Sequence, residues 1–155
     1  MSPRPSSARS PGSPAPTKRS RRDLPPDDLQ DLARLARRAR RRAHAPHSGF
    51  KVGAALRARR GEIVTGCNIE NATFGLTLCA ERVAVFKAVS EGIRGFDAVA
   101  VVADSPRLAP PCGPCRQILW ELCGDVWVHM ADLKGHSLTM RLSELLPLPF
   151  DARNL

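Results

Sequence analysis

The chain has 155 residues and lacks any apolar run that approaches the roughly 20 residues needed by a membrane-spanning helix. This absence excludes a transmembrane protein. The N-terminal residues also lack the apolar core of a secretory signal, so we expect a protein that is not exported. With 43% hydrophobic and 25% charged residues, the rest of the composition is typical of one globular domain.

Acidic side chains are scarce at one end of a chain whose formal net charge is +9. Residues 1–42 hold 12 basic and four acidic residues, a net charge of +8, whereas residues 43–155 carry a net charge of only +1. A basic protein of this kind is often a nucleic-acid binder. Because the body of the chain is almost neutral, we expect nucleic-acid binding to be weak at most and confined to the basic end.

Large apolar side chains are almost missing from residues 1–26, which contain seven of the 14 prolines. Such a segment cannot bury enough surface to offset its ordering entropy, so we expect a disordered tail, followed by one domain over residues 27–155. The Arg and Ser content of the tail also fits a transit peptide, but the amphipathic pattern of one is absent. The arginines at 40–42 fit a solvated helix face better than a polyanion site.

Apolar periodicity predicts helices and strands in alternation along the rest of the chain. The helix expected over residues 79–91 has Val83, Phe86 and Val89 at helical spacing, and the continuous apolar run at 97–104 suits a strand buried on both faces. The other expected elements are helices at 27–43 and 112–123, strands at 50–58, 62–68 and 125–130, and a strand followed by a helical turn at 138–146. This alternation predicts an α/β fold, a three-layer α/β/α sandwich around a mixed sheet of about five strands.

The five cysteines are odd in number and follow no export signal, which favours reduced thiols in the cytoplasm over a disulfide framework. Cys79, Cys112 and Cys115 fall at the expected N-termini of two helices, where free N–H groups stabilise thiolates. Three thiolates suit Zn²⁺ with a fourth position open to water, the arrangement of a catalytic site. Glu81 is well placed to take a proton from that water, and Cys-x-Glu followed by Pro-Cys-x-x-Cys is typical of zinc deaminases.

Three other interpretations of these cysteines are open. A structural zinc site could take Cys67 or Cys123 as its fourth ligand, but it would leave Glu81 without a role. The Cys-Gly-Pro-Cys segment at 112–115 could be a redox dithiol, but that motif normally precedes most of its sheet, and only 40 residues follow it here. Inert core thiols would not explain the neighbouring prolines.

From about residue 29 to 155 the chain resembles the small homotetrameric cytidine deaminases of pyrimidine salvage. The resemblance rests on five stretches in the same order: FKVGAAL at 50–56, TGCNIENA at 65–72, GLTLCAER at 75–82, PCGPCRQ at 111–117 and ELLP at 144–147. It implies one Zn²⁺ per subunit, held by Cys79, Cys112 and Cys115. It also implies that Glu81 carries a proton from the attacking water to N3 of cytosine and then to the leaving ammonia.

The resemblance implies further contacts with a small nucleoside substrate. Phe50 would pack against the base, Asn68 and Glu70 would hydrogen-bond the ribose 3′-hydroxyl, and the backbone at Ala80 would fix the carbonyl edge of the base. Arg82 would donate to a ligand thiolate and offset the net negative charge of Zn²⁺ with three thiolates.

The resemblance also implies that the rings of Phe74 and Phe150 reach the pocket of a neighbouring subunit in a homotetramer. The chain departs from the family pattern because it contains no tyrosine. His47 and Phe74 stand where Tyr is common, so a ring is kept at 74 but its hydroxyl is lost.

The expected reaction is the hydrolytic deamination of cytidine and deoxycytidine to uridine and deoxyuridine, with release of ammonia. One alternative is a basic nucleic-acid-binding protein built on a structural zinc. Another is a deaminase that acts on bases within RNA or on a cytosine-like antibiotic. The nearly neutral body and the Asn-x-Glu segment at 68–70 favour a free nucleoside.

Overall fold

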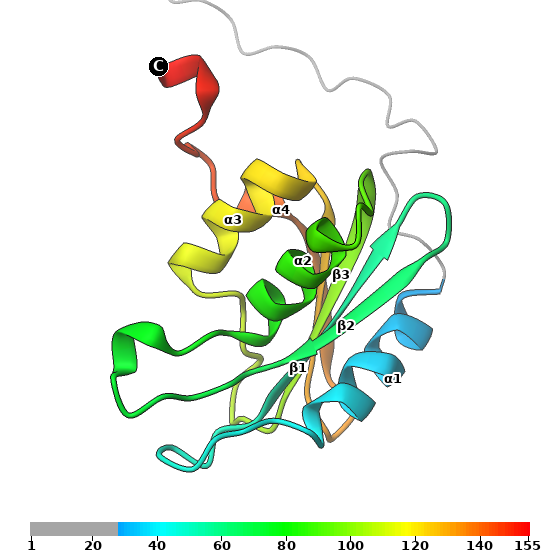
Figure 1. Ribbon diagram of the computed structural model, residues 1–155. Coiled ribbons are helices and arrows are strands. Elements are labelled where there is room, and N and C mark those ends of the chain that lie inside the picture. The colour runs from blue at the N-terminus through cyan, green and yellow to red at the C-terminus, as the bar shows by residue number, and fades with distance from the viewer. Residues whose placement is uncertain (1–27) are drawn as a thin grey trace, which may run out of the picture.

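One five-stranded sheet organises the part of the chain that the computed structural model describes, residues 28–155 (Figure 1). The tail expected over residues 1–26 lies outside the described residues. The strand order is β2-β1-β3-β4-β5. The strands are β1 (Val52–Ala58), β2 (Ile63–Cys67), β3 (Phe96–Ala103), β4 (Trp127–Ala131) and β5 (Ser137–Arg141). Only the β3–β4 pair is parallel and the other pairs are antiparallel, which confirms the mixed sheet of five strands.

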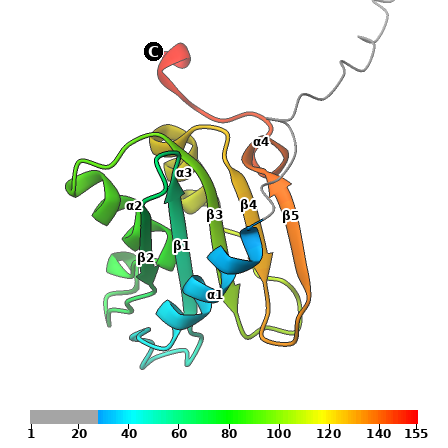
Figure 2. The same ribbon diagram turned by 90° about the vertical axis from the view of Figure 1, so that its right-hand side faces the viewer.

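Helices cover both faces of this sheet and give three layers (Figure 2). Helix α1 (Leu29–Arg40) lies on one face, and α2 (Ala80–Ser90) and α3 (Gly113–Cys123) lie on the other. Three short helices complete the structure: η2 (Phe74–Leu76), α4 (Leu142–Leu145) and η3 (Ala152–Asn154). The predicted α/β/α sandwich is therefore confirmed. None of the helices within residues 28–155 is long and apolar enough to cross a bilayer.

The central strand β3 is buried on both faces, as its continuous apolar sequence predicts. Val99 and Val101 pack with residues of α2 and α3, whereas Ala100 and Val102 pack with α1. The side chains of a strand alternate between the two faces of a sheet, so β3 contributes to both halves of the core.

The most buried face of α2 is not the one that carries its larger apolar residues at helical spacing. Phe86 is 41% exposed, and Val83 and Val89 are only partly buried. The residues of α2 that pack against the sheet are small: Ala80, Ala84, Val85 and Ala88.

Two glycines explain this preference for small residues, because each lets a helix backbone touch a strand. A Cβ atom added to Gly66 of β2 would lie 2.5 Å from the carbonyl oxygen of Ala80 and 2.6 Å from the amide nitrogen of Ala84. A Cβ atom added to Gly53 of β1 would lie 2.0 Å from the carbonyl oxygen of Ala36. At these two points the backbones of α2 and α1 lie directly on the sheet, with no room for a side chain on the strand.

Arg57 fastens the N-terminal end of α1 to the sheet. Its Nε donates to Asp97 at 2.8 Å, and its Nη1 donates to Asp28, the residue that precedes the helix. The other end of α1 lies beside the start of β1, where the Arg40 Nε donates to the carbonyl of Lys51 at 2.9 Å. Helix α1 thus runs antiparallel to β1 and is fixed at both ends.

We predict that Gly66→Ala destabilises the fold, because the added methyl group meets backbone atoms that cannot rotate away. Overpacking of this kind costs about 1–3 kcal/mol in the free energy of unfolding. Gly75→Ala is the matched control, since a Cβ atom there meets no atom within 4 Å. Urea denaturation of both variants measures the difference, and equal stability of the two would contradict the close contact of α2 with β2.

Candidate active site

Three cysteine thiols meet where the N-termini of α2 and α3 converge. Cys79 is the N-cap residue of α2, Cys112 is the N-cap residue of α3, and Cys115 lies in the first turn of α3. Their Sγ atoms all lie within 4.8 Å of one another, and those of Cys79 and Cys112 are 3.7 Å apart. Thiolates in a tetrahedral zinc site lie about 3.8 Å apart when each Zn–S bond is about 2.3 Å. The structure therefore brings the three predicted ligands together in a cluster that fits Zn²⁺.

The two remaining cysteines do not join this cluster. Cys67 ends β2, and Cys123 ends α3 at the opposite end of the helix from Cys112. Burial raises the pKa of Cys123 to about 12, which opposes the thiolate form that a metal needs. Among residues 28–155, the cluster thus has three members and no fourth protein ligand. This geometry argues against the structural four-cysteine site.

Hydrogen bonds within the cluster, and from Arg82, change the pKa values of its thiols. The pKa of Cys79 falls to about 5 because its sulfur accepts from Cys115 and from the Arg82 guanidinium, while the donated proton raises the pKa of Cys115 above its ordinary value. The Arg82 Nη2 lies 3.6 Å from the Cys79 Sγ and also donates to the carbonyl of Thr77 at 2.9 Å. The guanidinium of Arg82 therefore lies beside the sulfur of Cys79, the residue to which it was expected to donate.

Glu81 is buried next to the cluster, in the first turn of α2. It is only 4% exposed, and this burial raises its pKa to about 7. A carboxyl group with a pKa near neutrality can both accept and return a proton, which is the property required of a proton carrier.

A cavity of about 250 Å³ opens beside the cluster and Glu81. Four residues predicted to contact substrate line it: Phe50, Asn68, Glu70 and Ala80. Further lining residues were not predicted: Ser48, Val52, Thr77, Leu78, Val101, Ala109 and Pro110. Val52, Thr77 and Leu78 lie within the stretches that carry the resemblance, and Ser48, Ala109 and Pro110 lie within two residues of Phe50 or of the Pro-Cys segment, whereas Val101 carries no local signal.

Asn68 and Glu70 organise the mouth of this cavity. The Asn68 side chain accepts from the amide of Val52 and donates to the carbonyl of Phe50, both at 2.8 Å. Glu70 accepts from the hydroxyl of Ser48 and from the backbone amides of His47 and Ser48, and these bonds lower its pKa. Both side chains therefore hold the segment that carries Phe50, in addition to facing the cavity.

Phe74 and Phe150 do not line the cavity of their own chain. Phe74 is 75% exposed on η2, where its ring meets that of His47 edge-on with centroids 5.8 Å apart. Phe150 is 60% exposed on the C-terminal segment. The structure thus leaves two aromatic rings at the surface.

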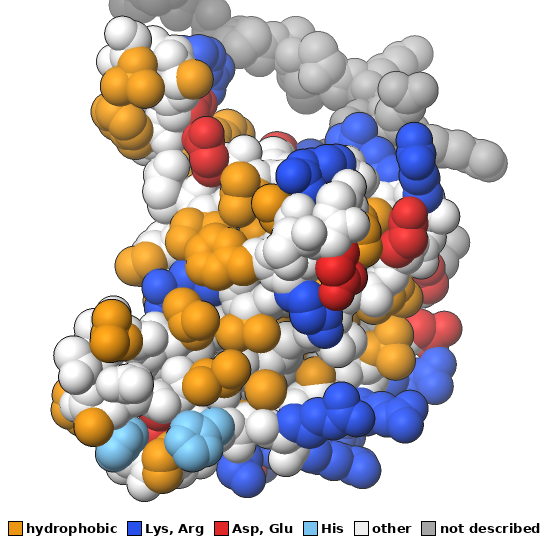
Figure 3. Space-filling model, in the orientation of Figure 1, with side chains coloured by type: hydrophobic (Ala, Val, Ile, Leu, Met, Phe, Trp, Pro, Cys, Tyr) orange, Lys and Arg blue, Asp and Glu red, His pale blue; other side chains and the backbone are white. Residues whose placement is uncertain are grey.

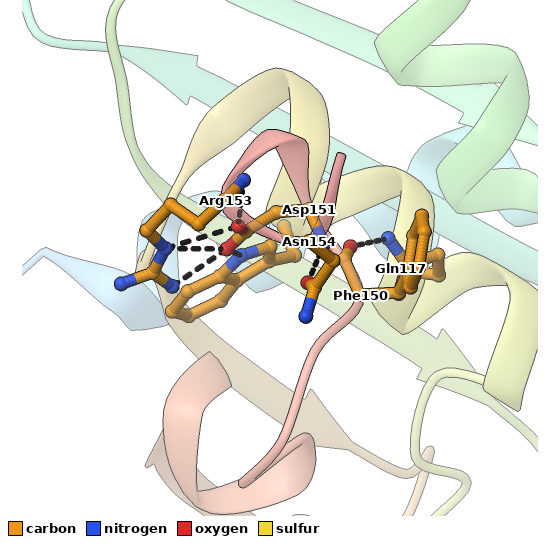
Figure 4. A network of polar contacts seen from close by, with 6 residues as sticks. Gln117, Phe150, Asp151, Arg153 and Asn154 are labelled. Carbon is orange, nitrogen blue, oxygen red and sulfur yellow. Dashed lines mark hydrogen bonds and ion pairs between the residues drawn. The ribbon is translucent and has the colours of Figure 1, made fainter.

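The C-terminal segment is nevertheless attached to α3 by polar contacts (Figure 4). Gln117 Nε2 donates to the carbonyl of Phe150 at 2.6 Å, and the Trp120 Nε1 donates to Asp151 at 3.2 Å. Asp151 also pairs with Arg153. These contacts fix the position of Phe150 relative to α3.

Arg116 supports the site through contacts that no sequence pattern predicts. Its Nε donates to the carbonyl of Pro111 at 2.7 Å, and its Nη1 donates to the carbonyl of Leu145 at 2.8 Å. Arg116 therefore ties the turn that carries Cys112 to the end of α4.

Comparison with known proteins agrees with this geometry. Residues 26–130 match the family described as the cytidine and deoxycytidylate deaminase zinc-binding region. A cytidine deaminase of Halalkalibacterium halodurans is 52% identical over 114 residues, which cover 73% of this chain and 86% of that protein. One of Sporosarcina psychrophila is 49% identical over 115 residues, covering 74% and 85%. The crystal structure of cytidine deaminase from Burkholderia pseudomallei superposes with a TM-score of 0.76 at 42% identity, covering 78% of this chain and 98% of that one.

We predict that Cys115→Ser removes bound zinc, whereas Cys123→Ser does not. Only Cys115 belongs to the cluster, although both thiols are on the same helix. The unaltered chain should hold about one zinc per chain after dialysis, as expected for a site with three thiolates. Metal analysis by mass spectrometry measures the difference, and zinc retained by the Cys115 variant would show that the ion binds elsewhere.

Proposed function

The chain belongs to the cytidine and deoxycytidylate deaminase family, and on this premise we propose that it deaminates cytidine and deoxycytidine to uridine and deoxyuridine, for the salvage of pyrimidine nucleosides. The observation that carries the proposal is the meeting of three cysteine thiols and one buried carboxyl group beside a single cavity. A structural zinc site would not need the buried carboxyl group or the cavity.

In this proposal Cys79, Cys112 and Cys115 hold Zn²⁺. The bound ion would supply Lewis acidity that lowers the pKa of a water toward neutrality. Arg82 donates to Cys79 and so draws negative charge away from the ligand set. It is held in that position by its second bond, to the carbonyl of Thr77.

Glu81 moves the protons of the reaction. Its carboxylate takes a proton from the attacking water and passes it to N3 of the cytosine ring, while the oxygen bonds to C4. Glu81 then takes the second proton from the hydroxyl group on C4 and delivers it to the amino group on the same carbon. The C4–N bond breaks, ammonia leaves, and the oxygen remains as the carbonyl of uracil. The burial of Glu81 supports this role, because a pKa of about 7 matches both steps.

The cavity mouth supports a free nucleoside as the substrate. Phe50 would pack on the base, and the backbone of Ala80 would contact its carbonyl. Asn68 and Glu70 would meet the ribose 3′-hydroxyl, with Glu70 oriented by the hydroxyl of Ser48. Because its hydrogen bonds lower the pKa of Glu70, the carboxylate is charged at neutral pH and would repel the 3′-phosphate of a polymer.

The proposed site also suggests where in the cell the protein acts and which part of the chain is catalytic. Since three thiols must stay reduced to bind a metal, we place the protein in the cytoplasm. We assign catalysis to residues 27–155 and none of it to the tail over residues 1–26.

We predict that Glu81→Gln lowers cytidine turnover by about 10²- to 10⁴-fold, because a neutral amide cannot accept the proton. Zinc content should not change, since Glu81 is not a ligand. Glu91→Gln, at the other end of α2, is the control and should keep full activity. Loss of absorbance on deamination, followed together with metal analysis, checks both. Turnover of the Glu81 variant within tenfold of the unaltered enzyme would disprove the assignment.

We further propose that the enzyme is a homotetramer in which neighbouring subunits complete each cavity. The rings of Phe74, Phe86 and Phe150 support this, because each is a large apolar side chain left exposed on the single chain. Apolar side chains also gather over α2 and α3 on the face seen in Figure 3. The bonds from Gln117 and Trp120 would then present Phe150 to a neighbour.

We predict that Phe150→Ala raises KM or lowers kcat for cytidine while the zinc content stays unchanged. Removing the ring should cost about 1–3 kcal/mol of packing at each site. Leu155→Ala is the control, because that side chain is almost fully exposed at the end of the chain. Kinetics run beside sedimentation velocity test the proposal. A fully active monomer, or unchanged kinetics of the Phe150 variant, would show that each chain closes its own cavity.

A further inference from the structure

A strongly cationic surface lies on α1, and the proposed reaction does not use it. Residues 32–61 contain ten Lys and Arg and no Asp or Glu. Five of these residues are exposed on α1 and the turn that follows it: Arg34, Arg37, Arg38, Arg41 and Arg42. We call these five residues the arginine face. Figure 3 shows Lys and Arg side chains gathered over the lower right of the molecule, where α1 lies.

The arginine face points in one direction. At about 100° per residue, the five side chains fall within an arc of about 140°. The opposite side of the helix carries the residues that pack toward the sheet: Leu29, Leu32, Ala33, Ala36 and Ala39. Since α1 is fastened at both ends and by Gly53, the helix cannot turn this face inward.

Most of this charge is not neutralised by the protein. Arg34 pairs with Asp31 at 2.6 Å. Within residues 28–155, no carboxylate lies within ion-pairing distance of the other four arginines. The C-terminal end of a helix dipole attracts cations, but its effective charge is only about half an elementary charge. The negative end of the helix dipole therefore offsets only a small part of the four positive charges.

We propose that the arginine face binds the phosphate backbone of nucleic acid without regard to base sequence. The guanidinium group matches phosphate oxygens with two parallel hydrogen bonds. No Phe, Trp or Tyr lies in α1 or in residues 41–46, and the imidazole of His44 is the one ring there, so bases lack the row of stacking rings that base readout needs. A membrane fits less well, because an amphipathic helix binds a bilayer through its apolar face, and that face of α1 is buried.

A hollow of about 120 Å³ extends this surface along the edge of α1 toward the turn between β4 and β5. Arg34 and Arg37 line it on the helix side, and Ser137 lines it on the other side together with Asp132 and His136, which pair with each other at 2.6 Å. The two guanidinium groups and the Ser137 hydroxyl offer donors to a phosphate group that lies between the helix and the sheet, on the side of the hollow away from Asp132. The backbone of a bound strand can therefore follow α1 along this edge.

The test compares two charge reversals in the full chain. Arg38→Glu with Arg41→Glu alters the arginine face. Arg59→Glu with Arg60→Glu alters the net charge equally, in the turn between β1 and β2, beyond the other end of α1. Fluorescence anisotropy with a short DNA duplex and a short single-stranded RNA, over a series of salt concentrations, measures affinity. Vesicles of phosphatidylglycerol are the competing probe, and cytidine turnover reports the fold of each variant.

We expect both nucleic acids to bind the unaltered chain and the Arg38/Arg41 variant to bind at least about tenfold more weakly at low salt. For the duplex, the slope of log affinity against log salt should fall by about two, one for each lost phosphate contact. The Arg59/Arg60 variant should keep its slope. If the first variant does not fold, Arg38→Gln with Arg41→Gln and the matching Gln pair at 59 and 60 replace the two reversals.

Three results would overturn the proposal. One is the absence of nucleic-acid binding by the unaltered chain at low salt. Another is equal weakening by both variants, which would assign binding to net charge or to the basic tail. The third is tighter binding to the vesicles than to either nucleic acid at the same salt concentration.

Discussion

The contact between α2 and β2 at Gly66 is the constraint on which the site depends. Gly66 has only a hydrogen atom where other residues carry a side chain, and the backbone of Ala80 and Ala84 packs against it. This contact fixes the distance between α2 and the sheet. The distance in turn fixes the position of the start of α2, where Cys79 and Glu81 lie. A helix kept further from the sheet by larger side chains would carry both groups away from α3.

The meeting of two helix N-termini then gives the site its electrostatic character. Free amide groups and the positive ends of two dipoles favour the thiolates, and Arg82 adds a full positive charge beside Cys79. The same enclosure that favours the cluster disfavours a charged carboxyl group at Glu81, which is buried and carries the raised pKa. The pKa of Cys79 is therefore lowered while the pKa of the nearby Glu81 is raised, which suits the metal-binding role proposed for the thiol and the proton-carrying role proposed for the carboxyl group.

Local sequence patterns predicted the parts of the fold whose determinants are close together in the chain. The apolar run of β3 indicated a strand buried on both faces, and the cysteines predicted at helix starts lie at two N-caps (Cys79 and Cys112) and in a first turn (Cys115). The buried face of α2 could not be predicted from the helix alone, because it is decided by a glycine on a strand that precedes the helix by more than a dozen residues. The backbone of Ala80 and Ala84 lies against Gly66, whereas the larger ring of Phe86 on the same helix is exposed.

The supporting contacts of the site could not be predicted for the same reason. The bonds of Arg116 join Pro111 to Leu145, which is 29 residues away from the arginine. Asn68 was predicted to meet a ribose, and its bonds to the backbone at 50 and 52 have no sequence signature. Such contacts depend on how strands and loops meet, so they become visible only in three dimensions.

The attachment of the C-terminal segment to Trp120 has an optical consequence. The chain has two tryptophans and no tyrosine, so these two indoles supply its intrinsic fluorescence. Trp127 is buried in the sheet beneath the guanidinium of Arg141, 4.9 Å from its ring centroid, where it is insensitive to the segment. Trp120 donates its N–H to Asp151. One fluorophore is therefore a fixed reference and the other reports, without any label, whether the end of the chain is in place.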